Sequence, residues 1–464
     1  MSVLSRLLRP RGRRALDAAG GGWRWAGHPV LGTTIPAPSS LVRHRAAYQA
    51  RNDAHVVRAV HALVSNIVGT GLWPRSRHPD EAIRTRLAEA FAAWSERADA
   101  AGRLDWPALQ TLLVRSMIES GEAFVRRVTG PDGRLRLQVL HPDQVDPSLS
   151  RDLDNGHRIR AGIELDPWGA PVAYHVLPQR PGDLAPLTWE PVRVPADSMI
   201  HLFEVLEPGQ VRGLSWLAPV MLRLHELAQY EDAQLVRQKV AALFVGFLKD
   251  PQGDGAGFTG AQTGGLLETG LEPGTLKVLP PGYDVAFSTP AEIGENDTFI
   301  RGQLRAIAAG LGVTYEQLTG DLSGVNYSSI RAGLIEFRRR VDSLRWTLLV
   351  PRLCRPVWRW WLEDEVLAGT VPLAAYGQNP APWLAADWHA PGWDWVDPVK
   401  DTQAEIMAVE AGFKARSQVI AERGEDPVRV DTLRRQDAER GSGLEAAPRP
   451  AAPAPGPSEE APDA

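Results

Sequence analysis

Three glycines in the middle of the chain have the spacing of a dinucleotide-binding loop. Gly255, Gly257 and Gly260 match the pattern Gly-x-Gly-x-x-Gly, which binds a pyrophosphate only when it lies directly between a strand and a helix. Residues 251–254 separate this run from any preceding strand, and residues 264–265 are both glycine where the helix should begin. The stretch therefore indicates a glycine-rich loop rather than a cofactor site.

Other short motifs that would predict catalysis or metal binding are missing or incomplete. None of the five lysines follows a glycine, which excludes a Gly-Lys-Ser/Thr phosphate loop. The pair His225-Glu226 has no second histidine four residues later, so the helical zinc motif is not formed. The serine nucleophile motif Gly-x-Ser-x-Gly does not occur. We therefore expect no metal site and no cofactor.

The remaining reactive groups are better explained by structure. Asp143 and Asp146 could form a pair of catalytic carboxylates, but they lie in a proline-containing turn after a predicted strand, where aspartate and proline serve turn geometry. Cys354 is the only cysteine and lies in an apolar, aromatic stretch, where thiols are usually inert. A single cysteine also excludes an intrachain disulfide.

Composition and charge describe a globular chain of several domains. The 464 residues are 44% hydrophobic and 23% charged, and the net charge is −5. Residues 1–51 carry nine Arg and one Asp, whereas residues 52–440 carry a net charge of −10. Most of the chain therefore lacks the basic surface of a protein that grips nucleic acid. The longest apolar run, residues 240–248, is too short to cross a bilayer.

The first half of the sequence predicts helices followed by a β-rich module. Helical periodicity and capping residues predict three helices, over residues 52–68, 80–98 and 105–121. The period then changes to that of strands. Alternation predicts hairpins with strands at 122–128 and 134–140 and at 159–165 and 170–177, and a further strand at 199–205.

The second half is dominated by long helices. Residues 216–248 predict one unbroken helix, and residues 249–275 are glycine-rich. Short strands at 275–279 and 285–288 and a helix at 296–310 follow, and the polar loop 319–327 precedes a long helix from about 328. Pro351 and Pro356 should kink or end that helix. Two more helices are expected near 400–412 and 427–440, so the fold class is α+β.

The helix from 328 carries a row of arginines beside its apolar stripe. Arg331, Arg338 and Arg345 are seven residues apart and therefore share one face. That face could contact DNA phosphates, pair with carboxylates of a neighbouring subunit, or be solvated. Eight of the sixteen Trp lie between residues 346 and 395. They could form a core or an interface, and the proline-rich surroundings favour an interface.

An ordered series of stretches resembles the lambda-type portal proteins of tailed bacteriophages. The series covers residues 50–425, and its members are Asn66-Ile-Val-Gly-Thr-Gly71, Leu137-Gln-Val-Leu-His-Pro-Asp-Gln-Val145, Gly162-Ile-Glu-Leu-Asp-Pro-Trp-Gly169, Val211-Arg-Gly-Leu-Ser-Trp-Leu-Ala-Pro219, Ala306-Ile-Ala-Ala-Gly-Leu-Gly-Val313, Leu318-Thr-Gly-Asp-Leu-Ser-Gly-Val-Asn-Tyr-Ser-Ser329, Gly392-Trp-Asp-Trp-Val-Asp-Pro398 and Arg416-Ser.

The resemblance implies a virion protein without catalytic activity or cofactor. It implies a ring-shaped homo-oligomer, a dodecamer, at one capsid vertex, assembled in the host cytoplasm and surrounding a channel for double-stranded DNA. Its implied partners are the terminase large subunit during packaging, the major capsid protein or scaffold, and the head–tail connector, with no membrane. The particle could be a phage, a prophage product or a gene-transfer particle.

The resemblance also divides the chain into the parts of a portal-type fold. A basic flexible arm (1–50) precedes a wing with a β-rich module (51–215). Stem helices (216–318) enclose a clip between about 249 and 295. A tunnel loop (319–327), a long wing helix (328–365), a crown-like region (366–440) and a disordered Pro/Ala-rich tail (441–464) follow. In the tunnel loop, Asp321, Ser323, Asn326 and Tyr327 are the candidates for contact with DNA.

Two other classes of protein remain open from the sequence. One is a DNA-packaging enzyme, a nuclease or ATPase, although the missing phosphate-loop and metal motifs argue against it. The other is a different ring-forming structural protein of the head–tail junction, but such adaptors are usually much shorter.

Overall fold

The computed structural model describes the chain as two compact units. The first consists of Met1–Ala62, Ile118–Gly121 and Leu214–Val325, and the second of Leu63–Met117, Glu122–Gly213 and Asn326–Ala464. The residues whose structure is described are 38–181, 190–242, 246–249, 261–263, 266–268, 284–287, 296–324, 327–393, 398–425 and 427–441.

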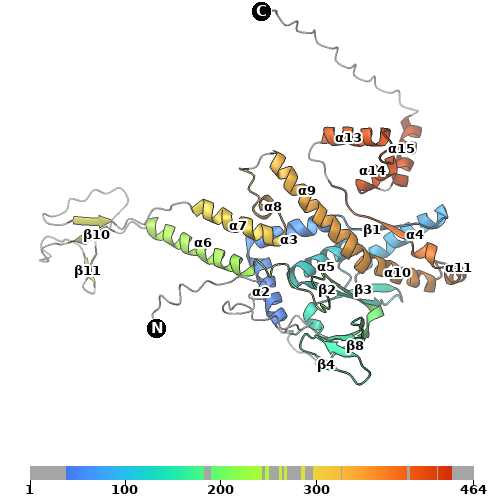
Figure 1. Ribbon diagram of the computed structural model, residues 1–464, viewed down its shortest axis with the longest axis horizontal. Coiled ribbons are helices and arrows are strands. Elements are labelled where there is room, and N and C mark those ends of the chain that lie inside the picture. Colours follow the sequence, from blue (N-terminus) through green and yellow to red (C-terminus); the bar gives the residue numbers. More distant parts are fainter. Residues whose placement is uncertain are drawn as a thin grey trace, which may run out of the picture. The chain divides into compact units, whose positions relative to one another are not determined.

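Helices form most of the first unit. Helix α2 (Pro38–Asn52) precedes α3 (Ala54–Ile67), whose first turn is capped by Asp53: its carboxylate accepts hydrogen bonds from the amides of residues 55 and 56. Helix α6 (Met221–Ala242) lies beside α7 (Asn296–Leu311), as Figure 1 shows in green and yellow. The Tyr230 hydroxyl donates to the side-chain oxygen of Asn296 at 2.6 Å and joins the two helices.

Two predictions for this unit are wrong. The expected helix 216–248 is divided: α6 covers only 22 residues, and residues 246–249 form strand β10 (Gly246–Lys249) instead. The apolar run 240–248 can satisfy a strand as well as a helix, and pairing of β10 with β13 (Asp284–Phe287) selects the strand. Residues 38–50 were expected in a flexible arm but form most of α2; residues 1–37 lie outside the described part of the chain.

Short strands occupy the region between α6 and α7. Strand β13 confirms the expected strand near 285–288, and β11 (Ala261–Thr263) pairs with β12 (Leu266–Glu268) in a second two-stranded sheet. The expected strand 275–279 lies outside the described residues.

The second unit contains the β-rich module. The expected first hairpin is confirmed by β2 (Glu122–Thr129) and β3 (Leu135–Leu140), and β9 (Met199–Phe203) completes a sheet in the order β3-β2-β9. A second sheet has the order β4-β5-β6-β7-β8, with bounds Arg151–Asp152, Arg158–Arg160, Ile163–Leu165, Pro171–Val176 and Val192–Pro195. The predicted strand 159–165 is divided by a turn in which Ala161 and Gly162 both have positive φ. Apolar side chains from both sheets meet in one core that includes Phe124, Tyr174 and Met199.

Helices and an aromatic core complete the second unit. Helix α4 (Glu81–Ser95) and helix α5 (Trp106–Ser120) confirm the two helices expected before the sheets. Phe91 of α4 lies within 6.3 Å, between ring centroids, of Trp94, Trp106, Trp358 and Trp361. Trp358, Trp360, Trp361, Trp383 and Trp388 are all buried within this single chain. The interface expected for the tryptophan cluster is therefore wrong for these five, which form a core.

The long helix from 328 is longer than its prolines predict. Helix α9 (Tyr327–Leu344) continues through the π-helical segment η4 (Arg345–Cys354) into α10 (Arg355–Leu367). Pro351 has no N–H to donate and its ring clashes with a regular helical carbonyl. The wider π turn, with the Arg355 amide donating to the carbonyl of Val350, accommodates it without ending the helix.

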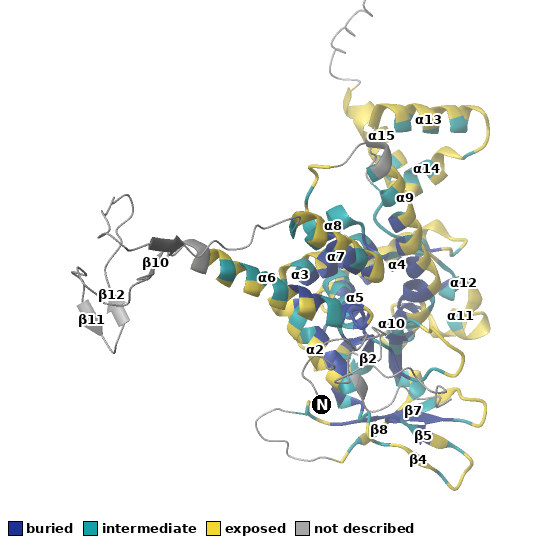
Figure 2. Cartoon of the chain, turned by 60° about the vertical axis from the view of Figure 1, so that its left-hand side comes forward, coloured by how far each residue is buried: buried dark blue, intermediate teal, exposed yellow. Residues whose placement is uncertain are grey.

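The C-terminal region adds short elements and a helical group. Strand β1 (Trp73–Ser76) pairs with β14 (Ala386–His389), and α11 (Leu373–Gln378) and α12 (Ala381–Leu384) precede it. The helices α13 (Pro398–Glu410) and α15 (Pro427–Gly441) confirm the two that were expected, and α14 (Arg416–Glu422) lies between them. Figure 2 shows that these three helices are largely exposed.

Candidate nucleic-acid interface

The loop expected to contact DNA begins directly after a short helix of the first unit. Helix α8 (Tyr315–Thr319) starts with a capping box between Thr314 and Gln317 and ends at Gly320, which has a φ of +76°. The structure describes the loop as far as Gly324. Of the four candidate residues, Asp321 and Ser323 are described, Asn326 lies outside the described residues, and the side chain of Tyr327 does too.

Asp321 organises the described part of this loop. Its carboxylate accepts hydrogen bonds from the amide (2.9 Å) and the hydroxyl (2.6 Å) of Ser323, and from the hydroxyl of Tyr315 at 3.3 Å. The Ser323 hydroxyl bond is the main reason that the pKa of Asp321 is lowered. Among the described residues, Arg301 forms an ion pair with this carboxylate, with its guanidinium at 3.9 Å. The loop therefore presents an ionised carboxylate, which repels phosphate.

The three arginines of the predicted basic face lie on one side of the helix, as expected from their spacing, but only Arg331 is exposed there, whereas Arg338 is half-buried and Arg345 is buried. Arg331 pairs with Asp401 of α13 at 3.4 Å. Arg338 and Arg345 lie over the ring of Trp393, with their guanidinium carbons 5.2 and 4.9 Å from its centroid. The partners are thus provided by the same chain.

Arg345 corrects the prediction of an open basic face. Its residue is only 3% exposed, and its guanidinium donates to the backbone carbonyls of Asn66, Ile67 and Pro391 at 2.7–3.2 Å. It also pairs with Asp342 at 3.4 Å. Arg345 therefore ties the end of α3 to the segment after β14 and is not available to DNA. Spacing alone could not show this, because it gives the face but not what covers it.

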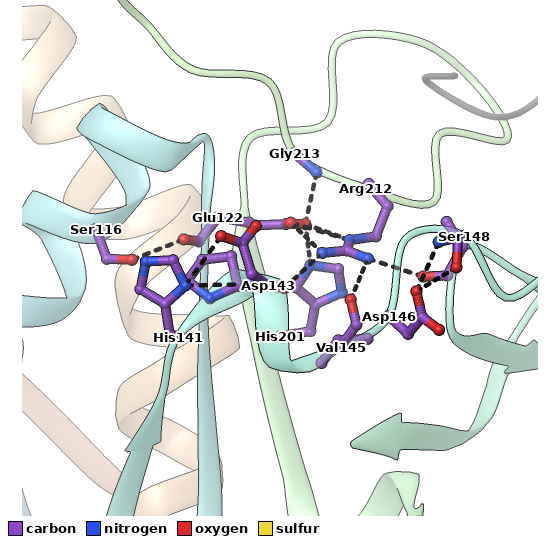
Figure 3. A network of polar contacts seen from close by, with 12 residues as sticks. Ser116, Glu122, His141, Asp143, Val145, Asp146, Ser148, His201, Arg212 and Gly213 are labelled. Carbon is purple, nitrogen blue, oxygen red and sulfur yellow. Dashed lines mark hydrogen bonds and ion pairs between the residues drawn. The ribbon is translucent and has the colours of Figure 1, made fainter. Parts of the chain in front are cut away.

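A buried ionic network that the sequence did not predict lies in the β-rich module (Figure 3). Glu122 begins β2, His201 lies in the neighbouring strand β9, and Arg212 follows β9. The guanidinium of Arg212 donates to the Glu122 carboxylate at 2.6–2.9 Å. The Nε2–H of His201 donates to the same carboxylate at 3.0 Å, since an ionised carboxylate can only accept.

Arg212 also fixes three loop carbonyls. Its remaining N–H groups donate to the backbone oxygens of Pro142, Val145 and Ala161 at 2.8–3.0 Å. These groups belong to the turn after β3 and to the positive-φ turn between β5 and β6. One side chain thereby connects both sheets. Its only signal in the sequence was its place in the stretch 211–219 of the resemblance.

The charge state of Glu122 follows from competing effects. Burial alone would raise the pKa of this carboxyl, but the charge of Arg212 and the hydrogen bonds from His201 and Arg212 outweigh it and lower the pKa well below its usual range. Burial lowers the pKa of His201, so its ring is neutral at pH 7. The network is thus a paired, fully hydrogen-bonded structural group rather than an acid–base pair poised for catalysis.

The other reactive groups among the described residues form no further site. They contain no group of three or more His, Cys, Asp or Glu side chains placed to hold a metal ion. They also include no helix that is long and apolar enough to span a membrane. Cys354 is fully buried, and burial raises the pKa of its thiol. Asp143, which the sequence suggested as half of a catalytic pair, is buried in the turn after β3.

Comparison with known proteins gives one consistent result. The family model for the phage portal protein of the lambda family matches residues 21–345. A probable portal protein of Halomonas phage phiHAP-1 is 30% identical over 432 residues, which cover 87% of this chain and 81% of that protein. Portal protein B of Escherichia phage lambda is 26% identical over 432 residues, 81% of this chain and 79% of that protein.

Solved structures show the same fold. The chain resembles a protein in the neck of a native gene-transfer-agent (GTA) particle determined with C12 symmetry, with a TM-score of 0.50, 18% identity, and coverage of 92% of this chain and 100% of that one. The chain also resembles a protein in the neck of an empty GTA particle determined with C6 symmetry. There the TM-score is 0.51, the identity is 18%, and the match covers 89% of this chain and 99% of that one. Together with the family match, the mixed helical and β architecture and the series of matching stretches, this shows that the chain belongs to the lambda family of phage portal proteins.

Proposed function

We propose that this portal protein assembles into a ring of twelve subunits at one vertex of a phage capsid, and that double-stranded DNA passes through the ring during packaging and ejection. The observation that carries the proposal is the match to lambda-family portal proteins over most of the chain. The likeness of its fold to a protein from a C12-symmetric particle neck supports the ring and the twelvefold number. The family is structural, and no enzymatic activity is named in these comparisons.

Exposed apolar side chains on α6 and α7 support self-assembly. Beyond Leu227 the described residues of α6 are not buried, and Leu235 and Val236 are 54% and 58% exposed. Phe299 of α7 is also exposed. In an isolated helix pair these apolar side chains are exposed to water, which is unfavourable, whereas neighbouring copies in a ring would bury them. We assign α6 and α7 to the stem of the ring, and the strands β10–β13 to the clip.

The electrostatics of the loop after α8 suit passage rather than capture of DNA. Non-specific affinity for DNA comes mainly from cations that neutralise phosphates. The described loop offers the carboxylate of Asp321 and a hydroxyl, that of Ser323, already bonded to it. We propose that Asp321, Ser323, Asn326 and Tyr327 form a tunnel loop that touches DNA only weakly. A packaging assay on a deletion of 321–326 tests this: a changed DNA retention supports the assignment, and unchanged retention rejects it.

The remaining parts follow from the same proposal. Residues 51–215 and the helix from α9 to α10 form the wing, and the region from α11 to α15 forms the crown. The terminase large subunit would dock on the ring during packaging, and the head–tail connector would replace it. The capsid protein or a scaffold would surround it during assembly in the host cytoplasm, and the product would be part of the virion.

Negative-stain electron microscopy and native mass spectrometry on one sample of the full-length protein test the ring. Closed rings with an open centre and a mass of twelve chains support the proposal. A protein that stays monomeric at high concentration and hydrolyses nucleotide in a DNA-dependent manner would instead identify the packaging enzyme left open by the sequence.

A further inference from the structure

A pocket of about 460 Å³ opens in the second unit between the β-rich module and the long helix. Its walls come from β2, β7 and β9 on one side and from η4 and α10 on the other. Tyr174 and Trp360 provide aromatic walls, and Pro351 and Pro356 line the helical side. This volume is within the range of pockets that hold a small ligand or a few residues of a peptide.

Three arginines line this pocket, and two of them have no partner in the described structure. Arg127 is occupied: it pairs with Glu363 at 3.1 Å and lies 5.8 Å from the ring centroid of Trp360. Arg352 and Arg359 are exposed, and no described residue forms a hydrogen bond or ion pair with either guanidinium. Two guanidinium groups without a partner among the described residues, in one concave site, are a recognition element for planar anions, which they bind through paired N–H donors.

The shape of the pocket selects among anions. Phosphates of duplex DNA lie on a broad convex surface, which reaches only the mouth of this half-open hollow of about 460 Å³. A single carboxylate side chain of a peptide can enter the hollow, where the aromatic and proline walls contact the apolar atoms of the peptide. Asp197 and Glu363 also line the site, so the three arginines leave a net positive charge of one, which favours a short acidic segment over a cationic or neutral one.

The chain contains a segment with this chemistry outside the described residues. Residues 450–464 carry Glu459, Glu460 and Asp463 and have no Lys or Arg. We propose that the acidic segment 459–463 docks in this pocket, with its carboxylates on Arg352 and Arg359.

Binding of a labelled peptide to the full-length protein tests the proposal. The protein carries Glu459→Gln, Glu460→Gln and Asp463→Asn, so that its own segment does not compete, and the probe is a fluorescein-labelled peptide of residues 450–464. We expect saturable binding by fluorescence anisotropy that weakens as NaCl is raised. Adding Arg352→Glu and Arg359→Glu should weaken binding at least tenfold, because each reversed charge repels the peptide.

Arg355→Glu is the matched control, because Arg355 is exposed on the same helical stretch but does not line the pocket. It should leave the affinity unchanged, and a peptide with the three acids neutralised should not bind. The proposal is overturned if the wild-type peptide does not bind, if Arg355→Glu weakens it as much as the paired reversal, or if duplex DNA displaces it at equal concentration. Circular dichroism of the variants confirms that their fold is intact.

Discussion

Replacing Arg212 should destabilise the β-rich module more than any surface substitution. Arg212→Met removes the charge that compensates Glu122 and leaves the carbonyls of Pro142, Val145 and Ala161 without their donor. Both charged side chains are at most 1% exposed, so water cannot replace the lost contacts. Breaking one partner of a buried ion pair typically costs about 3–5 kcal/mol. His201 and the amide of Gly213 still donate to the carboxylate, so we expect about 4 kcal/mol.

The reasoning also predicts how the pair behaves as a unit. Glu122→Gln should be similarly costly, because it leaves the buried guanidinium without its counter-charge. The double variant Glu122→Gln with Arg212→Met should recover at least about 2 kcal/mol relative to the sum of the two single changes. Asp152→Asn is the control: the Asp152 side chain is 79% exposed in its ion pair with Arg160, and loss of this pair should cost less than about 1 kcal/mol.

Urea unfolding followed by circular dichroism measures these free energies at pH 7, at one protein concentration, since assembly would add to apparent stability. Amide hydrogen exchange at β2 and β9 localises the effect to the module. A cost below about 1 kcal/mol for Arg212→Met, or strict additivity in the double variant, would refute the view that this network is a buried, coupled ion pair.

Three further outcomes follow from single residues. Hydrogen bonds from Arg193 lower the pKa of Glu164 to about 2 from an ordinary 4.5. The stability that the ionised Glu164 contributes is therefore complete above about pH 4.5 and is lost as the pH falls toward 2. The difference in unfolding free energy between wild type and Glu164→Gln should shrink over that window, and a difference independent of pH would contradict this. Gly121→Ala would place a Cβ 2.3 Å from the backbone carbon of Leu214, whereas the Cβ of Gly133→Ala, also at positive φ, meets open space. Gly121→Ala should therefore lower the free energy of unfolding in urea by about 2–3 kcal/mol more than Gly133→Ala. Equal costs would show that the backbone around Gly121 moves to accept the Cβ. Cys354 is buried with a raised pKa, so a thiol reagent should modify it only at the rate of unfolding, and rapid modification of the folded protein would show that the aromatic core is open.

Local signals in the sequence determined much of the secondary structure. Asp53 and Asp105 cap the helices that were expected to begin beside them, since their carboxylates accept from the first free amides. The hairpin of β2 and β3 formed with the predicted strands, because alternation and a glycine-containing turn are both properties of a few consecutive residues. The series of stretches also indicated the family that the comparisons then showed.

Features that depend on what packs against an element could be decided only by the tertiary structure. The run 240–248 is compatible with helix or strand, and pairing between β10 and β13 divides it. Pro351 predicts the end of a helix, yet a π turn carries the helix through. The tryptophans could be a core or an interface, and the fold buries five of the eight between 346 and 395, two of them against Phe91 of the distant helix α4.

The charged residues show the same difference between what local sequence predicts and what tertiary contacts decide. Seven-residue spacing placed Arg331, Arg338 and Arg345 on one face, but only the fold brings Trp393 and backbone carbonyls over that face and buries Arg345. Glu122 and Arg212 are 90 residues apart, and no local pattern relates them. Sequence determines propensities within a few turns or one hairpin, whereas burial and charge pairing depend on contacts between residues that only the folded chain brings together.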